Sequence, residues 1–191
     1  MEKGKNKNIE IEVRFLNIDY NNLVKTLHSQ GAEDFGEDLL HEIIFYDKDL
    51  KWQYEEKKFV RIRQTNKGVF LAFKNQQEET ATGTKEIEFK VEDFTKTKEF
   101  LEAIGLVAFR EQEKKRHTFK INGVIVDIDT WPSVPTYVEL EGPSEESLKM
   151  VTSKLGFDWS DVVFKAPRFI IEKVYKIPVS KLRFFTFNKI E

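Results

Sequence analysis

The segment 9–15 constrains the fold of this chain more than any other stretch. Its odd positions are all apolar, and its even positions are Glu10, Glu12 and Arg14. A period of two places successive side chains on opposite faces of a β-strand. We therefore expect a strand with one face on a hydrophobic core, while the other face presents two carboxylates and a guanidinium. Taken alone, the pattern is typical of a half-buried strand with a solvated outer face.

The chain repeats this alternation, which predicts seven further strands. We expect them at residues 39–46, 59–65, 69–74, 85–91, 111–121, 124–130 and 137–141. Asn66-Lys67-Gly68 and Asn122-Gly123 lie between consecutive strands and predict hairpins. Helices are expected at 20–30, 94–104, 143–155 and 169–175, a polar loop at 75–84 and an edge strand at 182–187. A strand of the form Glu-x-Glu precedes a helix twice, which hints at an internal duplication.

Length and composition fit one domain over residues 1–191. The formal net charge is only -2, so we expect no nucleic-acid partner, which would require a basic excess. With no Cys and three scattered His, neither a disulfide framework nor a Cys- or His-based metal centre is expected. No apolar run resembles a signal peptide or a membrane span. We therefore expect a cytoplasmic protein without a membrane partner, as a monomer or a homodimer.

Charged side chains gather on one face of the expected strands, and their set is nearly neutral. The acids are Glu10, Glu12, Glu86, Glu88, Asp127, Asp129, Glu139 and Glu141, and the bases are Arg14, Arg61, Arg63, Lys74, Lys90, Lys114 and Arg116. If these faces point outward, they are ordinary solvated surface. If they point inward, eight antiparallel strands would close into a barrel, and the helices would pack outside it.

An inward arrangement needs partners for the converging charges, because an unpaired ionised group in a low-dielectric interior is costly. Mg²⁺ and Mn²⁺ take carboxylate oxygens as ligands. Phosphate groups bind Arg and Lys. Clustered acids beside clustered bases would therefore suit a complex of a metal ion with a polyphosphate.

Glu10-x-Glu12-x-Arg14 resembles the Glu-x-Glu-x-Lys signature of the CYTH superfamily, the triphosphate tunnel metalloenzymes. The further matches, in the family's order, are Arg61-x-Arg63, Lys74 at the end of the next strand, Glu86-x-Glu88, Lys114-x-Arg116, and Asp129 followed by Glu139-x-Glu141. The resemblance covers residues 9–141, while residues 143–191 match only in general helical character. It implies an α+β fold, an eight-stranded antiparallel closed β-barrel with its charged faces inside and helices packed outside.

The resemblance also implies roles for the charged residues. The metal ligands for Mg²⁺ or Mn²⁺ would be Glu10, Glu12, Asp129, Glu139 and Glu141, with Glu10, Glu12 and Arg14 acting in catalysis. The triphosphate would be bound by Arg61, Arg63, Lys74, Lys114 and Arg116. The remaining lining residues would be Glu86, Glu88, Lys90 and Asp127. Two departures stand out: Arg14 replaces the signature lysine and cannot titrate, and residues 131–137 lack the Leu-Gly more often found in the cyclases.

Two reactions compete at such a site. In hydrolysis, water attacks the terminal phosphorus of a triphosphate, whereas in cyclisation the ribose 3′-hydroxyl of ATP attacks the α-phosphorus and pyrophosphate leaves. We expect hydrolysis of tripolyphosphate, thiamine triphosphate or ATP, because nothing in the sequence identifies the nucleoside pocket that cyclisation needs. A class IV-type adenylyl cyclase is the alternative. A non-catalytic polyphosphate-binding module is a third possibility, which only Arg14 favours.

Overall fold

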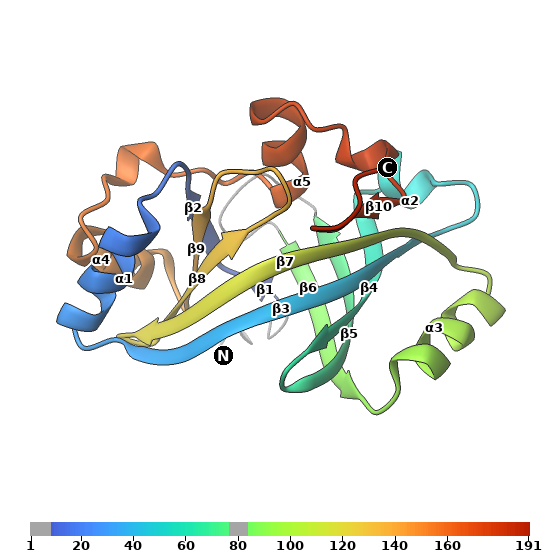
Figure 1. Ribbon diagram of the computed structural model, residues 1–191, viewed down its shortest axis with the longest axis horizontal. Coiled ribbons are helices and arrows are strands. Elements are labelled where there is room, and N and C mark those ends of the chain that lie inside the picture. Colours follow the sequence, from blue (N-terminus) through green and yellow to red (C-terminus); the bar gives the residue numbers. More distant parts are fainter. Residues whose placement is uncertain (1–8, 77–83) are drawn as a thin grey trace, which may run out of the picture.

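A strongly curled antiparallel sheet dominates the computed structural model, which describes residues 9–76 and 84–191 (Figure 1). The strands are β1 (Ile9–Glu10), β2 (Glu12–Phe15), β3 (Glu33–Tyr46), β4 (Lys58–Thr65), β5 (Gly68–Gln76), β6 (Thr84–Val91), β7 (Val107–Ile121), β8 (Val124–Thr130), β9 (Tyr137–Glu141) and β10 (Phe184–Phe185). The α+β class and the antiparallel pairing expected from the sequence are confirmed. Of the expected loop at 75–84, residues 77–83 lie outside the described residues, and its ends belong to β5 and β6.

The strand order begins and ends on one segment of the chain. It runs β1-β6-β5-β4-β3-β7-β8-β9-β2, and only Ile11 separates β1 from β2. The single strand expected at 9–15 is therefore two short strands, of which β1 pairs with β6 and β2 pairs with β9. One segment thus takes part in both ends of the curled sheet.

The central pair, β3 and β7, is longer than the sequence predicts. Both strands begin before the stretches predicted at 39–46 and 111–121. Residues 33–38 show no period of two, so the sequence did not predict the first part of β3. A register shift between Asp34 and Glu37 interrupts their pairing, and Gly36 between them has a φ of 80°. The hairpin between β7 and β8 is confirmed: Asn122 and Gly123 both have positive φ, as a type I′ turn requires.

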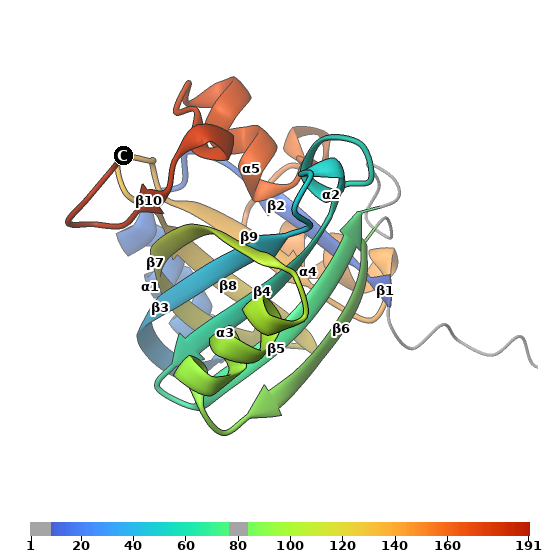
Figure 2. The same ribbon diagram turned by 90° about the vertical axis from the view of Figure 1, so that its right-hand side faces the viewer.

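Helices pack against the outer face of the sheet and over one of its ends (Figures 1 and 2). They are α1 (Tyr20–Ser29), α2 (Lys51–Tyr54), α3 (Phe94–Ala103), α4 (Glu145–Lys154) and α5 (Pro167–Phe169), with 3-10 turns η1 (Trp159–Asp161) and η3 (Val179–Lys181) and a π turn η2 (Ile170–Val174). Asp19 and Asp93 cap α1 and α3 by accepting backbone N–H groups. The sequence did not predict α2, and none of the described helices is long and apolar enough to cross a membrane.

The hydrophobic core lies between the helices and the outer face of the sheet. Under α1 and α4, Leu27 and Leu148 belong to the same buried cluster as Val13 and Leu140 of β2 and β9. A second cluster includes Leu101 of α3 with residues of β3 and β4. Since the apolar faces point outward under helices, the charged faces of the same strands point inward. The structure therefore favours the inward arrangement over a solvated charged surface.

Candidate functional site

Cross-strand pairing places the charged residues of several strands on one face. Residues directly opposite each other in an antiparallel pair share a face of the sheet. Three rows follow from the register: Phe70, Arg63, Glu42 and Gln112; Glu88, Ala72, Arg61, Ile44 and Arg110; and Arg116, Asp129 and Tyr137. Because the sheet curls toward this face, the rows face one another across its interior.

The inner face encloses a cavity of about 540 Å³. The predicted site residues that line it are Glu10, Glu12, Arg14, Arg61, Arg63, Lys74, Glu86, Glu88, Lys114, Arg116, Glu139 and Glu141. Asp127, Asp129 and Lys90 do not line it. Lys90, predicted as a lining residue, is exposed near Gly68 at the far end of its strand.

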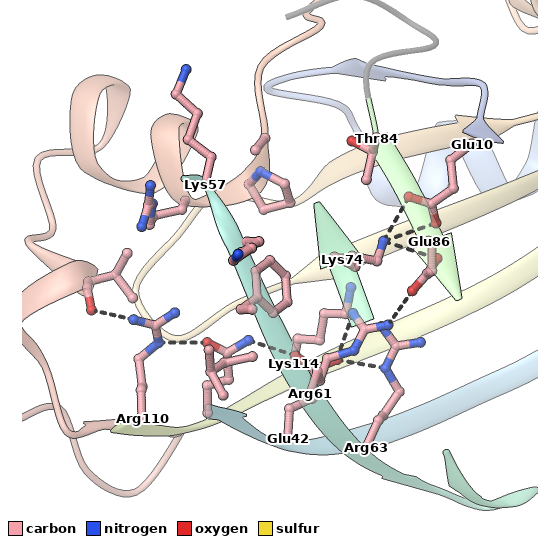
Figure 3. Close-up of a pocket in the computed structure, with 18 of the residues that line it drawn as sticks. Glu10, Glu42, Lys57, Arg61, Arg63, Lys74, Thr84, Glu86, Arg110 and Lys114 are labelled. Atoms are coloured by element: carbon pink, nitrogen blue, oxygen red, sulfur yellow. Dashed lines mark hydrogen bonds and ion pairs between the residues drawn. The ribbon is translucent and has the colours of Figure 1, made fainter. Parts of the chain in front are cut away.

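Glu42 is the buried centre of the basic part of the cavity (Figure 3). Its side chain is enclosed, with the residue 1% exposed, and its Oε1 accepts from Arg63 Nε at 2.7 Å and lies 3.6 Å from Arg61 Nη1. Its other oxygen accepts from Gln112 Nε2 at 2.6 Å. Burial acts to raise the pKa of Glu42, but Arg63 and Arg61 outweigh it and hold that pKa well below its ordinary value.

Lys74 joins the basic part to the first strand of the chain. Its ammonium donates to both oxygens of Glu10 at 2.9 Å and lies 3.3 Å from Glu86 Oε2 (Figure 3). Burial, followed by a hydrogen bond to Glu86, raises the pKa of Glu10. Burial also acts to raise the pKa of Glu86, but the hydrogen bond to Glu10, together with Lys74 and Arg61, lowers it. The pKa values of the two neighbouring carboxyls are therefore pushed in opposite directions.

The opposite part of the cavity gathers carboxylates around Arg14. One nitrogen of its guanidinium, Nη2, lies 2.7 Å from Glu12 Oε1 and 2.6 Å from Glu139 Oε2. Glu141 stands directly across from Glu12 on the paired strand. Burial, followed by repulsion from Glu139 and Glu12, raises the pKa of Glu141 to about 7. Three carboxylates thus gather here, and the guanidinium of Arg14 pairs with two of them, Glu12 and Glu139.

Asp129 lies behind this surface and does not reach the cavity. It is fully buried, and Lys114 and Arg116 donate to its oxygens at 2.6 to 2.7 Å. Asp127 pairs with Arg116 and accepts from Thr118. The expectation that Asp129 is a metal ligand therefore does not fit this arrangement, because both of its oxygens already accept from bases that point into the cavity.

The fit of the remaining carboxylates to a divalent metal depends on their surroundings. Glu12, Glu139 and Glu141 have suitable oxygen donors, line the cavity and lie on two paired strands. Nevertheless, no three acidic or histidine side chains of residues 9–76 and 84–191 stand close enough together to hold a metal ion. The carboxylates of Glu12 and Glu139 are paired with Arg14, so a metal bound by them would have to replace ion pairs that exist without it.

Several polar residues of the cavity carry no signal in the sequence. Glu42 lies in a mainly apolar stretch. Arg110 stands just before the predicted strand at 111–121, and Gln112 lies at its start. Arg110 is 5% exposed and donates to Gln112 Oε1 and to the Val179 carbonyl, and no carboxylate in the described ranges lies within ion-pair distance of it. Burial lowers the pKa of Arg110.

The C-terminal part of the chain covers one end of the cavity. Ala166, Pro167, Arg168, Ile171 and Val179 contribute to its lining, above the strands in Figure 2. This segment is helical near 169–175, as expected, and the expected edge strand is reduced to β10, which pairs in parallel with β7.

The family model of the CYTH domain matches residues 8–158. A conserved hypothetical protein from Pyrococcus furiosus is 24% identical with a TM-score of 0.69, over 83% of this chain and 97% of that chain. A proposed adenylate cyclase from Vibrio parahaemolyticus is 11% identical with a TM-score of 0.71, over 86% and 98%. The proposed adenylyl cyclase HpAC1 from Hippeastrum is 15% identical with a TM-score of 0.62, over 88% and 96%. No curated protein matches the chain.

Proposed function

Because the chain belongs to the CYTH domain family, we propose that it is a divalent-metal-dependent enzyme that hydrolyses a triphosphate-containing small molecule. The observation that carries this proposal is the convergence of Arg and Lys side chains with carboxylates on one cavity inside the sheet. A triphosphate needs several cationic groups to fix it in line, and its reaction needs neutralisation of the charge that develops. The cavity offers groups for both tasks.

The bases have a direct role in this proposal. Arg61, Arg63, Lys74, Lys114 and Arg116 would bind the phosphate oxygens, exchanging some of their present carboxylate partners for the substrate. Glu42 and Asp129 are buried behind them and would keep the guanidinium and ammonium groups directed inward. Bases that are already oriented lose little side-chain freedom when the substrate binds.

The acids would hold Mg²⁺ or Mn²⁺. Glu10, Glu12, Glu139 and Glu141 line the cavity and supply oxygen donors of the kind these ions prefer. When bound, the metal supplies charge neutralisation for the phosphates and orientation of the attacking water. Within the same group, Arg14 pairs with Glu12 and Glu139.

We propose further that the sheet closes around the substrate as a tunnel. The pairing of β1 with β6 and of β2 with β9 supports this, since both ends of the strand order meet on the segment Ile9–Phe15. A closed wall would exclude bulk water from the phosphates and strengthen every ion pair to them.

Cyclisation of ATP is the second candidate, and one feature of the cavity favours an organic substrate. Tyr46, Trp52 and Phe59 line the cavity beside the basic group, and such aromatic walls suit a nucleoside or another organic group better than an inorganic chain. Hydrolysis remains the preferred reaction. It is supported by HpAC1, the Hippeastrum neighbour, whose structure is described as revealing a dominant triphosphatase activity.

The test is phosphate release from tripolyphosphate, thiamine triphosphate and ATP with Mg²⁺ or Mn²⁺, measured beside cyclic AMP formation. Arg61→Ala should lose activity, whereas Lys90→Ala, which removes a charge outside the cavity on β6, should keep it. Cyclic AMP as the main product from ATP would select the cyclase. If no substrate is turned over with either metal, yet polyphosphate binds, the protein is a binding module and the enzymatic proposal is wrong.

A further inference from the structure

Arg14 holds a position that a bound cation would otherwise take. A single nitrogen, Nη2, lies within 2.7 Å of an oxygen of both Glu12 and Glu139. Both carboxylates line the cavity, and both belong to the group that the proposed function assigns to the metal. The guanidinium therefore already supplies the positive charge between these two acids.

The chain anchors this guanidinium on its other side. Arg14 Nη1 donates to the Lys165 carbonyl at 3.2 Å, and the backbone of Arg14 exchanges two hydrogen bonds with Val163. Arg14 is only 3% exposed. Moving it away from Glu12 and Glu139 would leave a buried charge without its partners, which is strongly unfavourable.

The third acid of the group shows what happens without such a partner. Glu141 faces Glu12 directly, and no base of the described residues stands within ion-pair distance of it. The carboxylates are therefore divided into a pair satisfied by Arg14 and a single unsatisfied Glu141. This division explains physically why no three of them, among the residues described, assemble a metal site in this arrangement.

Arginine suits this position better than lysine would. Its planar fork can bridge two carboxylates and still donate to a carbonyl on the far side, and it remains charged at all accessible pH values. A lysine ammonium is a single point of charge on a flexible stem, so it cannot hold the Lys165 carbonyl and both acids in the same geometry. The acids would then be freer to turn toward a metal.

We propose that the Arg14 guanidinium competes with divalent metal for Glu12 and Glu139, so that the protein without substrate binds the metal only weakly. This inference rests on the proposed function for the identity of the metal ligands. It predicts that metal binds well only together with the triphosphate, whose oxygens complete the coordination that Arg14 prevents the protein from supplying alone.

The experiment is a titration of the substrate-free protein with Mn²⁺, followed by electron paramagnetic resonance of the free ion. Arg14→Lys should bind Mn²⁺ about tenfold more tightly than the unaltered protein, in the range found when groups around metal ligands are changed. Arg183→Lys makes the same chemical change on the outside of the cavity and should leave the Kd unchanged. Glu139→Gln combined with Arg14→Lys should abolish the gain.

The unaltered protein gives an independent check if Arg14→Lys does not fold. Because its acids are already paired, Mn²⁺ should leave its Tm unchanged in the absence of phosphate. Tight Mn²⁺ binding by the unaltered protein, or equal affinities in the two proteins, would overturn the inference. If both proteins hydrolyse the substrate with metal and have equal Kd values for Mn²⁺, the inference about Arg14 is wrong and the proposed function stands. If neither protein binds metal or hydrolyses the substrate, the inference and the proposed function are both wrong.

Discussion

Replacing Glu42 by glutamine tests how the basic part of the cavity is held together. The carboxylate accepts from both Arg63 Nε and Gln112 Nε2, whereas the amide of the Glu42→Gln variant would offer only one oxygen for these two donors. Turning the Gln112 amide round would not help, because its own oxygen accepts from Arg110. One buried donor is left without an acceptor, and one charge-assisted hydrogen bond is weakened. Together these two effects should lower the free energy of unfolding by about 3 kcal/mol.

This loss should be visible as a lower melting temperature. For a protein of this length, about 3 kcal/mol corresponds to a decrease in Tm of roughly 6–12 °C. Tripolyphosphate should reverse part of the decrease, because its oxygens replace the missing negative charge beside Arg61 and Arg63. Urea unfolding and thermal melts, each with and without tripolyphosphate, measure both effects.

Glu111→Gln is the matched control for this substitution. Glu111 lies on β7, which pairs with the strand of Glu42, but its side chain is 41% exposed, and among the described residues it forms an ion pair only with His41, at 2.8 Å. Its loss should change stability by less than about 0.5 kcal/mol. If Glu42→Gln is no more destabilising than Glu111→Gln, or if tripolyphosphate stabilises the Glu42→Gln protein no more than the unaltered one, the buried ion-pair argument is refuted.

Four further changes give separate expectations. Glu139→Gln should act mainly on kcat and on the metal concentration required, whereas Arg63→Ala should act mainly on KM. Steady-state kinetics should show for each a loss on the order of 2–4 kcal/mol in kcat/KM. Burial and like charges raise the pKa of Glu141 to about 7 in the folded protein, so the penalty that its carboxylate places on folding grows from its ordinary pKa up to about 7 and is constant above that pH. In metal-free thermal melts, Glu141→Gln should therefore raise Tm near about pH 8, and by much less near about pH 5, where Glu141 of the folded protein is neutral. Asp19→Ala removes the N-cap bond to Asn22 and should lower the unfolding free energy by about 1 kcal/mol in urea titrations.

The sequence predicted the strands best where alternation and turn residues agree. The strands at 124–130 and 137–141 have the expected bounds, and Asn122-Gly123 forms the expected turn. Their inner and outer faces could be separated by parity alone. Which face points inward could not, because it depends on the packing of α1, α3 and α4 against the apolar side.

The residues that the sequence concealed share a physical cause. Glu42 is the one acid in a mainly apolar strand segment. Its role depends on hydrogen bonds from Arg63 of β4 and Gln112 of β7, which are distant in the sequence. Asp129 has the parity of a lining residue, yet two longer side chains cover it. Parity fixes the face of a strand, but side-chain length and the curl of the sheet decide which groups on that face reach the cavity.

The order of the elements suggests why acids and bases are separated within the cavity. Twice along the chain, a Glu-x-Glu segment leads through an Asp-capped helix of ten residues into a long strand, β3 or β7, and then into a hairpin. The hairpin of β4 and β5 carries the bases Arg61, Arg63 and Lys74, whereas that of β8 and β9 carries the acids Asp127, Asp129, Glu139 and Glu141. Two identical halves would set like charges against one another, which a low-dielectric interior penalises. Without a ligand, each hairpin finds its counter-charges on neighbouring strands: Arg61 and Lys74 pair with Glu86 of β6, whereas Arg116 of β7 pairs with the acids of β8 and β9. A complex of metal and phosphate would offer the opposite charge to both hairpins at once.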